Sequence, residues 1–311
     1  MIVVTGAAGF IGKHLMRCLL EKTPHDILAL DNLSRGNWNG FEENGRVSLI
    51  TGDVRDVNLL NRIMDGAEIV FHLAGQSTVL GAILDIDSTF SSNVIGTYNV
   101  MRASERGGVR HVVFTSSREV YGEPKSIPVT EDFPLAAKNP YGASKIACEA
   151  FCRIFDSDEM HVSVLRLANA YGFGDHDRVI PIFIECALKD DALVINGGEQ
   201  VIDFVPVDLV VESLWRVANR PLGRPVNVGT GVGTTLQDLA TRIIGDSGSL
   251  STIEYSSANA MEVTRFVADV TRMEDALGII PPEDPLAYLK DQIITSSVSM
   301  SIPLRSEFER R

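Results

Sequence analysis

The sequence predicts an α/β protein built on a doubly wound parallel sheet, followed by a smaller lobe. In the first half of the chain, short and continuous apolar runs alternate with helical stretches, and a glycine-rich turn separates the first run from the first helix. Continuous apolar runs indicate strands buried on both faces, as in a parallel sheet covered by helices. This alternation of strands and helices is typical of doubly wound sheets of the Rossmann type.

The elements are expected in the following order. Six apolar runs predict the strands of the sheet, at 2–5, 27–31, 47–50, 68–72, 111–115 and 162–167. Helices are expected near 11–21, over 94–105 and after Pro140. After about residue 170 the alternation breaks, and the patterns predict helices near 179–189 and 208–219 and short strands near 193–195 and at 226–228. We therefore expect a sheet domain over 1–170 and a smaller mixed α/β lobe over 171–311.

Composition and charge exclude several classes of protein. The chain has 311 residues and a formal net charge of −13, which argues against nucleic acid or anionic membranes as partners. No apolar run reaches the roughly 18 residues of a membrane span, and the N-terminus lacks the basic start of a signal peptide. No cluster of His or Cys completes a metal site around the cysteines, so we expect free thiols, no metal and a reducing, cytoplasmic setting. The cysteines are Cys18, Cys148, Cys152 and Cys186.

The stretch TGAAGFIGKHL places Gly6, Gly9 and Gly12 between the first strand and the first helix. A turn this tight lets the backbone approach a pyrophosphate closely, and the helix N-terminus supplies N–H groups and positive potential. The spacing G-x-x-G-x-x-G is a weak signal alone, because glycine-rich turns between strand and helix also serve plain packing.

Two aspartates strengthen the case for a dinucleotide. Asp31 closes the second strand, where a carboxylate accepts hydrogen bonds from an adenosine ribose, and Asp53 follows the third strand, within reach of an adenine amino group. The alternative is that both are ordinary loop aspartates at strand ends. The carboxylate of Asp31 would repel a 2′-phosphate, which favours NAD over NADP, although Arg35 keeps NADP open.

Tyr141 and Lys145 lie four residues apart after Pro140, so both point to one face of the expected helix. A free tyrosine ionises only near pH 10, and a nearby ammonium or an oxidised nicotinamide favours the phenolate. The pair thus suits an acid/base catalyst that removes a hydroxyl proton. Alone, it could also be a half-buried tyrosine beside a solvated lysine.

Taken together, these residues resemble the extended short-chain dehydrogenase/reductase family, and within it the nucleotide-sugar epimerases and dehydratases similar to UDP-glucose 4-epimerase. The resemblance runs from residue 1 to about 280. The motifs that carry it are TGAAGFIG, DNLSRG, GDVRD, HLAG, NVIGT, TSSREVYGEP, NPYGASK and RLANAYG. It also implies a homodimer, because the helices near 94–105 and 143–155 are similar to those that pair between subunits.

The resemblance implies a role for each matching residue. Tyr141 would be the acid/base, Lys145 its electrostatic partner and Ser117 the hydroxyl that binds the reacting oxygen of the sugar. The residues implied in substrate binding are Ser117, Arg118, Asn169, Arg178 and Arg265, with Asn169 holding the phosphates. The residues implied in NAD binding are Gly6, Gly9, Phe10, Ile11, Gly12, Asp31, Asn32, Ser34, Asp53, Val54, Leu73, Ala74, Gly75, Asn93, Tyr141 and Lys145.

Glu119 bears on which reaction follows removal of hydride from the sugar. In sugar dehydratases a glutamate here acts as the base at C5, but an acid usually precedes it, and this chain has Arg118 instead, which stays protonated. We therefore favour a 4-epimerase acting on a UDP-hexose or UDP-hexuronate through a transient 4-keto sugar. A 4,6-dehydratase or decarboxylase that uses Glu119, a structural role for this carboxylate, and a catalytically idle NAD-binding protein remain alternatives.

Two arginines that the family usually carries are absent. Ile202 stands where an arginine normally pairs with the phosphates of the nucleotide, and the stretch 259–262 lacks a second one. A charged hydrogen bond of this kind contributes about 1.5–3 kcal/mol. Arg178 or Arg265 could compensate, or the substrate could differ from the usual UDP-hexose.

Overall fold

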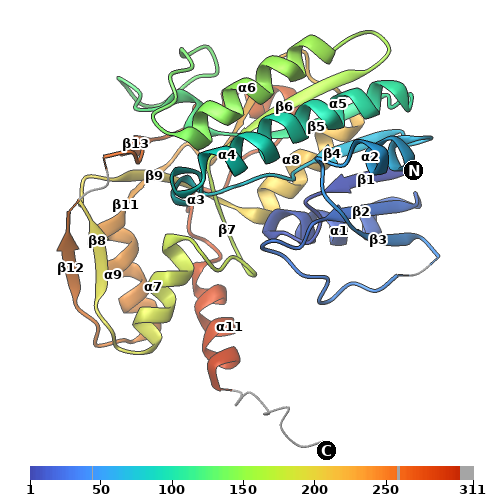
Figure 1. The fold of residues 1–311 in the computed structure, drawn as a ribbon. Coiled ribbons are helices and arrows are strands. Elements are labelled where there is room, and N and C mark those ends of the chain that lie inside the picture. The colour runs from blue at the N-terminus through green and yellow to red at the C-terminus, as the bar shows by residue number, and fades with distance from the viewer. Residues whose placement is uncertain (44, 258–259, 302–311) are drawn as a thin grey trace, which may run out of the picture.

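The computed structural model describes residues 1–43, 45–257 and 260–301 (Figure 1). At its centre is a seven-stranded sheet with the strand order β10-β6-β5-β4-β1-β2-β3, in which every neighbouring pair is parallel. The predicted doubly wound parallel sheet is therefore confirmed. Its strands are β1 (Ile2–Thr5), β2 (Ile27–Asp31), β3 (Val47–Thr51), β4 (Ile69–His72), β5 (His111–Ser117), β6 (His161–Leu167) and β10 (Val226–Val228).

Helices cover both faces of this sheet. On one face α1 (Phe10–Lys22) packs against α8 (Val207–Asn219), and on the other face α5 (Gly96–Arg106) packs against α2 (Val57–Met64) and α6 (Pro140–Phe155). Strand β1 shows why the sheet must be covered twice. Ile2 and Val4 belong to the core under α1 and α8, whereas Val3 belongs to the core under α2 and α5. Continuous apolar runs in the sequence therefore correspond to strands buried on both faces.

A second group of strands forms the smaller lobe. A four-stranded sheet combines β7 (Asn169–Tyr171), β9 (Val201–Pro206), β11 (Gly233–Thr235) and β13 (Arg265–Phe266), and β8 (Leu193–Asn196) pairs with β12 (Ile253–Ser256). The helices of this region are α7 (Val179–Leu188), α9 (Leu236–Ser247), α10 (Thr271–Leu277) and α11 (Leu289–Ser301). The sequence predicted α7, β8, α8 and β10, but it did not predict the short strands β7, β9, β11, β12 and β13.

The chain does not divide in space at one residue. Strand β10 and helix α8 both follow residue 170, yet β10 pairs with β6 in the central sheet and α8 packs on α1. Figure 1 shows α8 beside the sheet, away from α7, α9, β8 and β12. The central domain therefore draws on residues from both expected parts, because the chain returns to the sheet after it has begun the lobe.

Four short helical segments lie before α5 or directly after β5. The helix expected over 94–105 is preceded by α3 (Val79–Leu84), α4 (Ile86–Thr89) and a π-helical segment, η1 (Phe90–Ile95), and a 3₁₀ turn, η2 (Arg118–Tyr121), follows β5. All four cysteines are free. Among the described residues no helix has the length and hydrophobicity needed to cross a membrane, and no group of three metal-binding side chains occurs.

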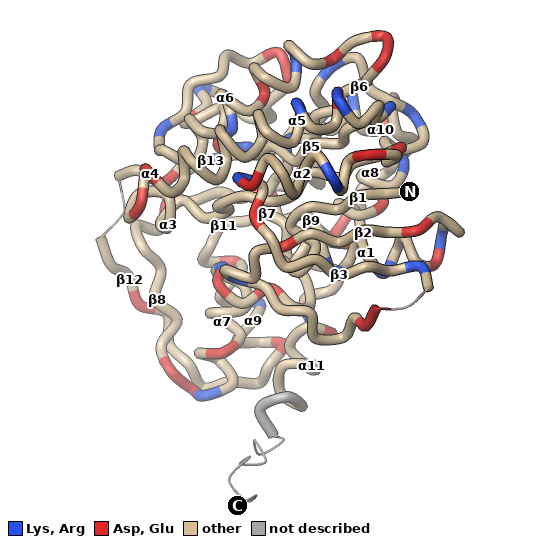
Figure 2. The backbone as a smooth tube through the Cα atoms, turned by 45° about the vertical axis from the view of Figure 1, so that its right-hand side comes forward, with Lys and Arg blue, Asp and Glu red and all other residues tan. Residues whose placement is uncertain are grey.

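Basic and acidic side chains are interspersed. Throughout the part of the chain that the structure describes, Figure 2 shows Lys and Arg positions alternating with Asp and Glu positions rather than gathering in one stripe. An anionic ligand must therefore be met by local donors at a specific site.

Candidate active site

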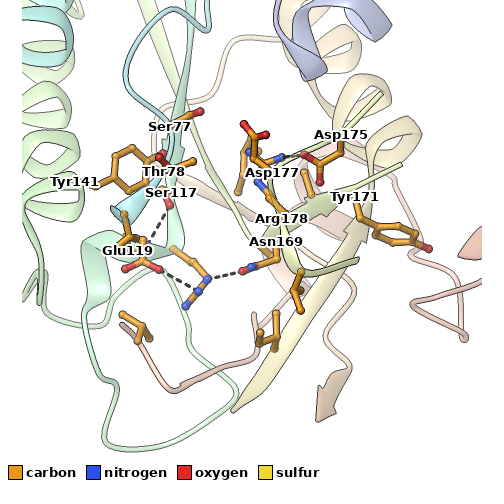
Figure 3. Close-up of a pocket in the computed structure, with 18 of the residues that line it drawn as sticks. Ser77, Thr78, Ser117, Glu119, Tyr141, Asn169, Tyr171, Asp175, Asp177 and Arg178 are labelled. Carbon is orange, nitrogen blue, oxygen red and sulfur yellow. Dashed lines mark hydrogen bonds and ion pairs between the residues drawn. The ribbon is translucent and has the colours of Figure 1, made fainter. Parts of the chain in front are cut away.

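A cavity of about 470 Å³ opens at the carboxyl ends of β4, β5 and β6, where the central sheet faces the lobe. Leu73, Ser117 and Leu167 line it from the sheet, and Phe183 and Ile202 line it from α7 and β9. In open parallel sheets the carboxyl edge of the strands is where ligands bind, because the loops there converge at the topological switch point. Figure 3 shows Tyr141 and Ser117 on one side of this space and Asn169, Asp175 and Arg178 on the other.

Helix α6 brings Tyr141 and Lys145 to this cavity. The helix begins at Pro140, and the side chain of Asn139 caps it by accepting a hydrogen bond of 2.9 Å from the backbone N–H of Gly142. Both Tyr141 and Lys145 are buried and line the cavity, and the ammonium of Lys145 lies 5.9 Å from the centre of the Tyr141 ring. The Lys145 ammonium also donates to the carbonyl of Thr115 at 2.9 Å, which holds it beside the phenol.

Ser117 is the last residue of β5 and faces the same cavity. Its hydroxyl accepts a hydrogen bond of 3.2 Å from the N–H of Glu119 and so caps the short turn η2. A hydroxyl oxygen that accepts this bond still has its own proton to donate to a ligand. The structure thus brings together Ser117, Tyr141 and Lys145, which the sequence places on two different elements.

Glu119, which is buried, and Arg118, which is mostly buried, form an ion pair at the cavity wall. Glu119 Oε1 lies 3.0 Å from Arg118 Nη2, and Glu119 Oε2 accepts a hydrogen bond of 2.7 Å from Asn139 Nδ2. Arg118 Nε donates to Asn169 Oδ1 at 2.5 Å, and its guanidinium lies over the ring of Phe266. Figure 3 marks the ion pair of Glu119 and the hydrogen bond of Asn169 with the guanidinium that lies between these two labelled residues. Both oxygens of Glu119 are therefore engaged with neighbouring side chains.

The glycine-rich turn after β1 has the shape of a phosphate cradle. Gly6 has φ of +74°, and a Cβ on it would lie 2.7 Å from the backbone nitrogen of Ala74. A Cβ on Gly12 would lie 2.2 Å from the carbonyl oxygen of Gly6, so neither position accepts a larger residue. Gly9 precedes α1 as its cap, and in the described chain no side chain caps this helix. Its first N–H groups are left for a ligand at the positive end of the helix.

The residues predicted to meet the adenosine end lie around the ends of β2 and β3. Asp31 Oδ2 accepts from the N–H of Ala8 at 3.0 Å, which ties the second strand to the glycine-rich turn. Asn32 Nδ2 donates to Asp53 Oδ2 at 2.9 Å. The guanidinium of Arg55 bonds to both oxygens of Asp53 and holds the pKa of that carboxyl well below its usual value. Arg55, which the sequence analysis did not single out, therefore competes for Asp53.

The other predicted cofactor residues fall into two groups. Asn93 Oδ1 accepts from the N–H of Gln76 at 2.7 Å and would contact a Cβ on Gly75, so it fixes the loop after β4. Ile11, Leu73 and Gly75 line the cavity. The residues that lie outside its lining, at the cofactor turn, after β2, β3 and β4, and on η1, are Gly6, Gly9, Phe10, Gly12, Asp31, Asn32, Ser34, Asp53, Val54, Ala74 and Asn93.

The predicted substrate residues are not all at the cavity. Arg118, Asn169 and Arg178 line it, whereas Arg265 is exposed on β13 and is not among its lining residues. Its neighbour Phe266 takes the buried side of this short strand, which turns Arg265 toward solvent. Ile202 lines the cavity as an apolar side chain where the family usually has an arginine. Of the stretch 259–262, residue 259 lies outside the described part of the chain.

Two acidic residues on the loop after β7 were missed by the sequence analysis. Asp175 is buried, and its Oδ1 accepts from Arg178 Nη1 at 3.1 Å, while Oδ2 has no partner among the described residues. Burial raises the pKa of this carboxyl. Asp177 pairs with Arg35, whose other nitrogen donates to Ser77 Oγ at 2.8 Å. Only the tertiary fold brings these loops together, and the sole sequence signal is the acidic pair DHD.

The residues at this site fit NAD. The turn around Gly6 and Gly12 is so tight that a Cβ at either position would clash with the backbone. Among the described residues no side chain caps the first N–H groups of α1, and Asp31 ends the neighbouring strand. These are the groups that bind a pyrophosphate and an adenosine ribose. Arg35, the residue that could have bound the 2′-phosphate of NADP, instead contacts Ser77 and Asp177.

Comparison with known proteins agrees with this arrangement. Residues 2–229 match the model of the NAD dependent epimerase/dehydratase family. The chain is 35% identical over 295 residues to a UDP-glucose 4-epimerase of Mycolicibacterium smegmatis, covering 90% of this chain and 93% of the relative. It is 32% identical over 295 residues to a dTDP-glucose 4,6-dehydratase of Streptomyces griseus, covering 91% and 90%.

A solved structure has the same fold. The crystal structure of a UDP-glucose 4-epimerase with UDP-glucose from Thermotoga maritima matches with a TM-score of 0.91 at 29% identity, covering 96% of this chain and 99% of that one. The sequence motifs, the cofactor turn and these comparisons agree. The chain belongs to the NAD-dependent epimerase/dehydratase family and, as the sequence predicted, is an enzyme that uses NAD.

Proposed function

We propose that this enzyme is a nucleotide-sugar 4-epimerase that inverts C4 of a UDP-linked hexose or hexuronate through a transient 4-keto sugar. The similar proteins include both epimerases and dehydratases, so membership of the family does not distinguish between the two reactions. The observation that favours an epimerase is the pairing of the Glu119 carboxylate. Its carboxylate is bonded on both oxygens, to Arg118 and to Asn139.

The alternative reactions demand more of this carboxylate. A 4,6-dehydratase that uses Glu119 needs a free carboxylate to remove the C5 proton and a neighbouring acid to protonate the leaving hydroxyl. Arg118 occupies the neighbouring position and stays protonated. An epimerase needs neither group, because hydride leaves and returns at one carbon. The pairing of Glu119 with Arg118 and Asn139 therefore favours epimerisation over dehydration.

The proposed acid/base chemistry uses the residues on α6 and β5. Tyr141 would take the proton of the sugar 4-hydroxyl, and the Lys145 ammonium 5.9 Å from its ring centre would stabilise the phenolate. The hydroxyl of Ser117 would donate a hydrogen bond to the same sugar oxygen and so position it next to Tyr141. Bound NAD supplies the acceptor, and then the donor, of the hydride at C4.

Specific residues would hold the cofactor and the substrate phosphates. The N–H groups at Phe10, Ile11 and Gly12 would bind the cofactor pyrophosphate, and Asp31 would accept from the adenosine ribose. Asn32, Ser34, Asp53 and Val54 would surround the adenine, and Leu73, Ala74, Gly75 and Asn93 would follow the nicotinamide ribose. On the substrate side, the amide nitrogen of Asn169 and the guanidinium of Arg178 would bind the phosphates.

The experiment incubates the protein with UDP-glucose, UDP-glucuronate and dTDP-glucose and follows the products by NMR. We expect the C4 epimer of the accepted substrate, in equilibrium with it, and no net change in NAD. A stable 4-keto-6-deoxy sugar, or release of CO₂ with a pentose product, would transfer the function to a dehydratase or a decarboxylase. No product with any sugar nucleotide, from protein that has NAD bound, would favour the idle NAD-binding alternative.

Glu119→Gln gives a second test. It preserves the shape and one acceptor oxygen of this side chain but removes its charge and any capacity to act as a base. We expect less than a tenfold loss of epimerase activity, whereas a C5 base would lose about 100- to 10,000-fold.

We also propose a homodimer in a cytoplasmic setting. Tyr98 on α5 and Ile154 on α6 are exposed, and the ring of Tyr98 contacts Phe151 and Phe155 of α6. This leaves an apolar surface on the two helices that the family resemblance pairs between subunits. The four free thiols support the reducing setting. Light scattering of the purified protein at micromolar concentration tests the dimer, and Ile154→Glu should shift it toward monomer.

A further inference from the structure

Arg118 is a cation that the proposed epimerase chemistry does not use. Only 11% of its side chain is exposed, and it lines the active-site cavity. It directly follows Ser117, the residue proposed to meet the reacting oxygen. A buried guanidinium is costly to keep unless its N–H groups find acceptors, so this position needs an explanation.

The protein provides acceptors for only some of the N–H donors of this guanidinium. Nε donates to Asn169 Oδ1, and Nη2 lies 3.0 Å from one oxygen of Glu119. Nη1 has no acceptor among the described residues, so the fork of the guanidinium is incompletely matched inside the cavity. The contacts with Asn169 and Glu119 restrict its orientation, and the Phe266 ring lies 5.8 Å from Cζ. A fixed guanidinium with spare N–H donors is suited to binding a carboxylate or a phosphate.

The position of Arg118 favours a group on the sugar over the phosphates. The diphosphate of a sugar nucleotide is attached at C1, across the ring from C4. Ser117, which is proposed to meet the oxygen on C4, is the residue next to Arg118 in the chain. The ring substituents beside C4 are those on C3 and C5, and in a hexuronate the substituent on C5 is a carboxylate.

The phosphates have another candidate partner. Arg178 lies at the start of α7, on the lobe side of the cavity. Arg118 occupies Asn169 Oδ1, and the amide nitrogen of Asn169 has no acceptor among the described residues. Arg118 thereby orients the Asn169 amide toward a ligand, while its own Nη1 group is left for a different one.

We infer that Arg118 binds a carboxylate on the sugar ring, so that a nucleotide-linked hexuronate is the preferred substrate. This inference rests on the proposed 4-epimerase function and adds the class of sugar to it. Glu119 is then a positioning residue, since its carboxylate and the amide of Asn139 hold the guanidinium in place rather than reacting with the sugar.

The test compares two substrates that differ only in the group on C5. Epimerisation of UDP-glucuronate and of UDP-glucose is followed by NMR with the NAD-bound protein and its Arg118→Gln variant. We expect kcat/KM of the native protein to be at least about tenfold higher for the uronate. We expect Arg118→Gln to lower kcat/KM for UDP-glucuronate by about 10- to 100-fold, as for loss of a charged hydrogen bond, and to change that for UDP-glucose less than threefold.

The outcomes separate this inference from the function on which it rests. An equal loss for both substrates would assign Arg118 to the shared phosphates, and a native preference for UDP-glucose would likewise overturn the inference, while both leave the 4-epimerase function intact. Native protein that epimerises neither substrate would overturn the function itself. Arg224→Gln, at an exposed arginine outside the cavity, is the control and should leave the ratio of the two substrates unchanged.

If Arg118→Gln loses NAD or fails to fold, two further measurements decide the question. Native protein is titrated with UDP-glucuronate and with UDP-glucose in a calorimeter, and we expect at least about tenfold tighter binding of the uronate. Arg118→Lys retains the charge without the planar fork, so it should recover part of the uronate preference. Equal affinity of the native protein for the two ligands would contradict the inference.

Discussion

The carboxylate of Glu149 accepts a hydrogen bond of 2.5 Å from the hydroxyl of Ser116, and it also binds the guanidinium of Arg166 through both oxygens. Ser116 directly precedes Ser117, and Glu149 lies one turn beyond Lys145 on α6. This contact therefore ties the helix that carries the proposed acid/base to the strand that carries the proposed sugar-binding hydroxyl. It fixes their separation from behind the cavity wall, since Ser116 lines the cavity and neither Glu149 nor Arg166 does.

Replacing Glu149 by Gln should destabilise the protein by about 3–5 kcal/mol, because Arg166 would be left as a buried and unpaired charge. Both side chains are buried, and their nitrogen and oxygen atoms lie 2.7 Å apart. Urea unfolding measures this loss. The matched control is Glu105→Gln, which breaks the exposed pair with Arg102 on α5 and should cost less than about 1 kcal/mol. Similar losses in both variants would contradict the role of the buried pair.

Replacing Tyr141 by Phe should lower kcat by about 100- to 10,000-fold, because the ring packing is kept and only the group that moves the proton is lost. Bound NAD, measured from the absorbance of nucleotide released on denaturation, should be unchanged. Tyr255→Phe is the control, because Tyr255 is exposed on β12 and does not line the cavity. Full turnover by Tyr141→Phe would remove this residue from the acid/base role.

The sequence was sufficient to predict the central sheet because each of its strands carries its own signal. Strands β1 and β5 each contain consecutive apolar residues, and the turn at Gly6 and Gly12 is so tight that only glycine fits at these positions. Tyr141 and Lys145 share a helix face by spacing alone. These features are local, so they can be read before any tertiary contact is known.

The remainder depends on contacts between distant segments. Strands β11 and β13 have three and two residues and acquire their identity only by pairing with β9. The sequence indicated that Arg118 replaces an acid, but not that it would bond to Asn169, 51 residues away. It also offered Arg265 as a phosphate ligand, and the short strand β13 turns this side chain away from the cavity.

The contact between Arg35 and Asp177 should slow the exchange of bound NAD. It joins the loop after β2 to the loop after β7, and Arg35 also bonds to Ser77 of the loop after β4. These three loops surround the site proposed for the cofactor. Arg35→Gln and Asp177→Asn should each release NAD up to about fivefold faster, the scale of an exposed ion pair. Dissociation of NAD is measured after dilution, with Arg102→Gln as control. Unchanged rates in both loop variants would show that the contact does not retain the cofactor.

Stability should fall in mild acid because of His72. This side chain is fully buried between the hydroxyls of Thr5 and Thr97, at 2.7 and 2.9 Å, and burial together with the nearby Lys145 ammonium lowers its pKa to about 3. In the unfolded chain a histidine has a pKa of about 6.5. Below that pH His72 is therefore protonated in the unfolded state but stays neutral in the folded state. The stability present above pH 6.5 is therefore lost progressively as the pH falls toward 3.

The size of this effect can be isolated with a variant. One histidine with these two values loses about 2 kcal/mol between pH 7 and pH 5. Urea unfolding of the native protein and of His72→Asn at both pH values should show a smaller pH dependence in the variant by this amount, whatever its absolute stability. His25→Asn, at an exposed position, should keep the pH dependence of the native protein. The same slope in His72→Asn as in the native protein would mean that His72 is protonated in the folded state, which burial and the Lys145 ammonium disfavour.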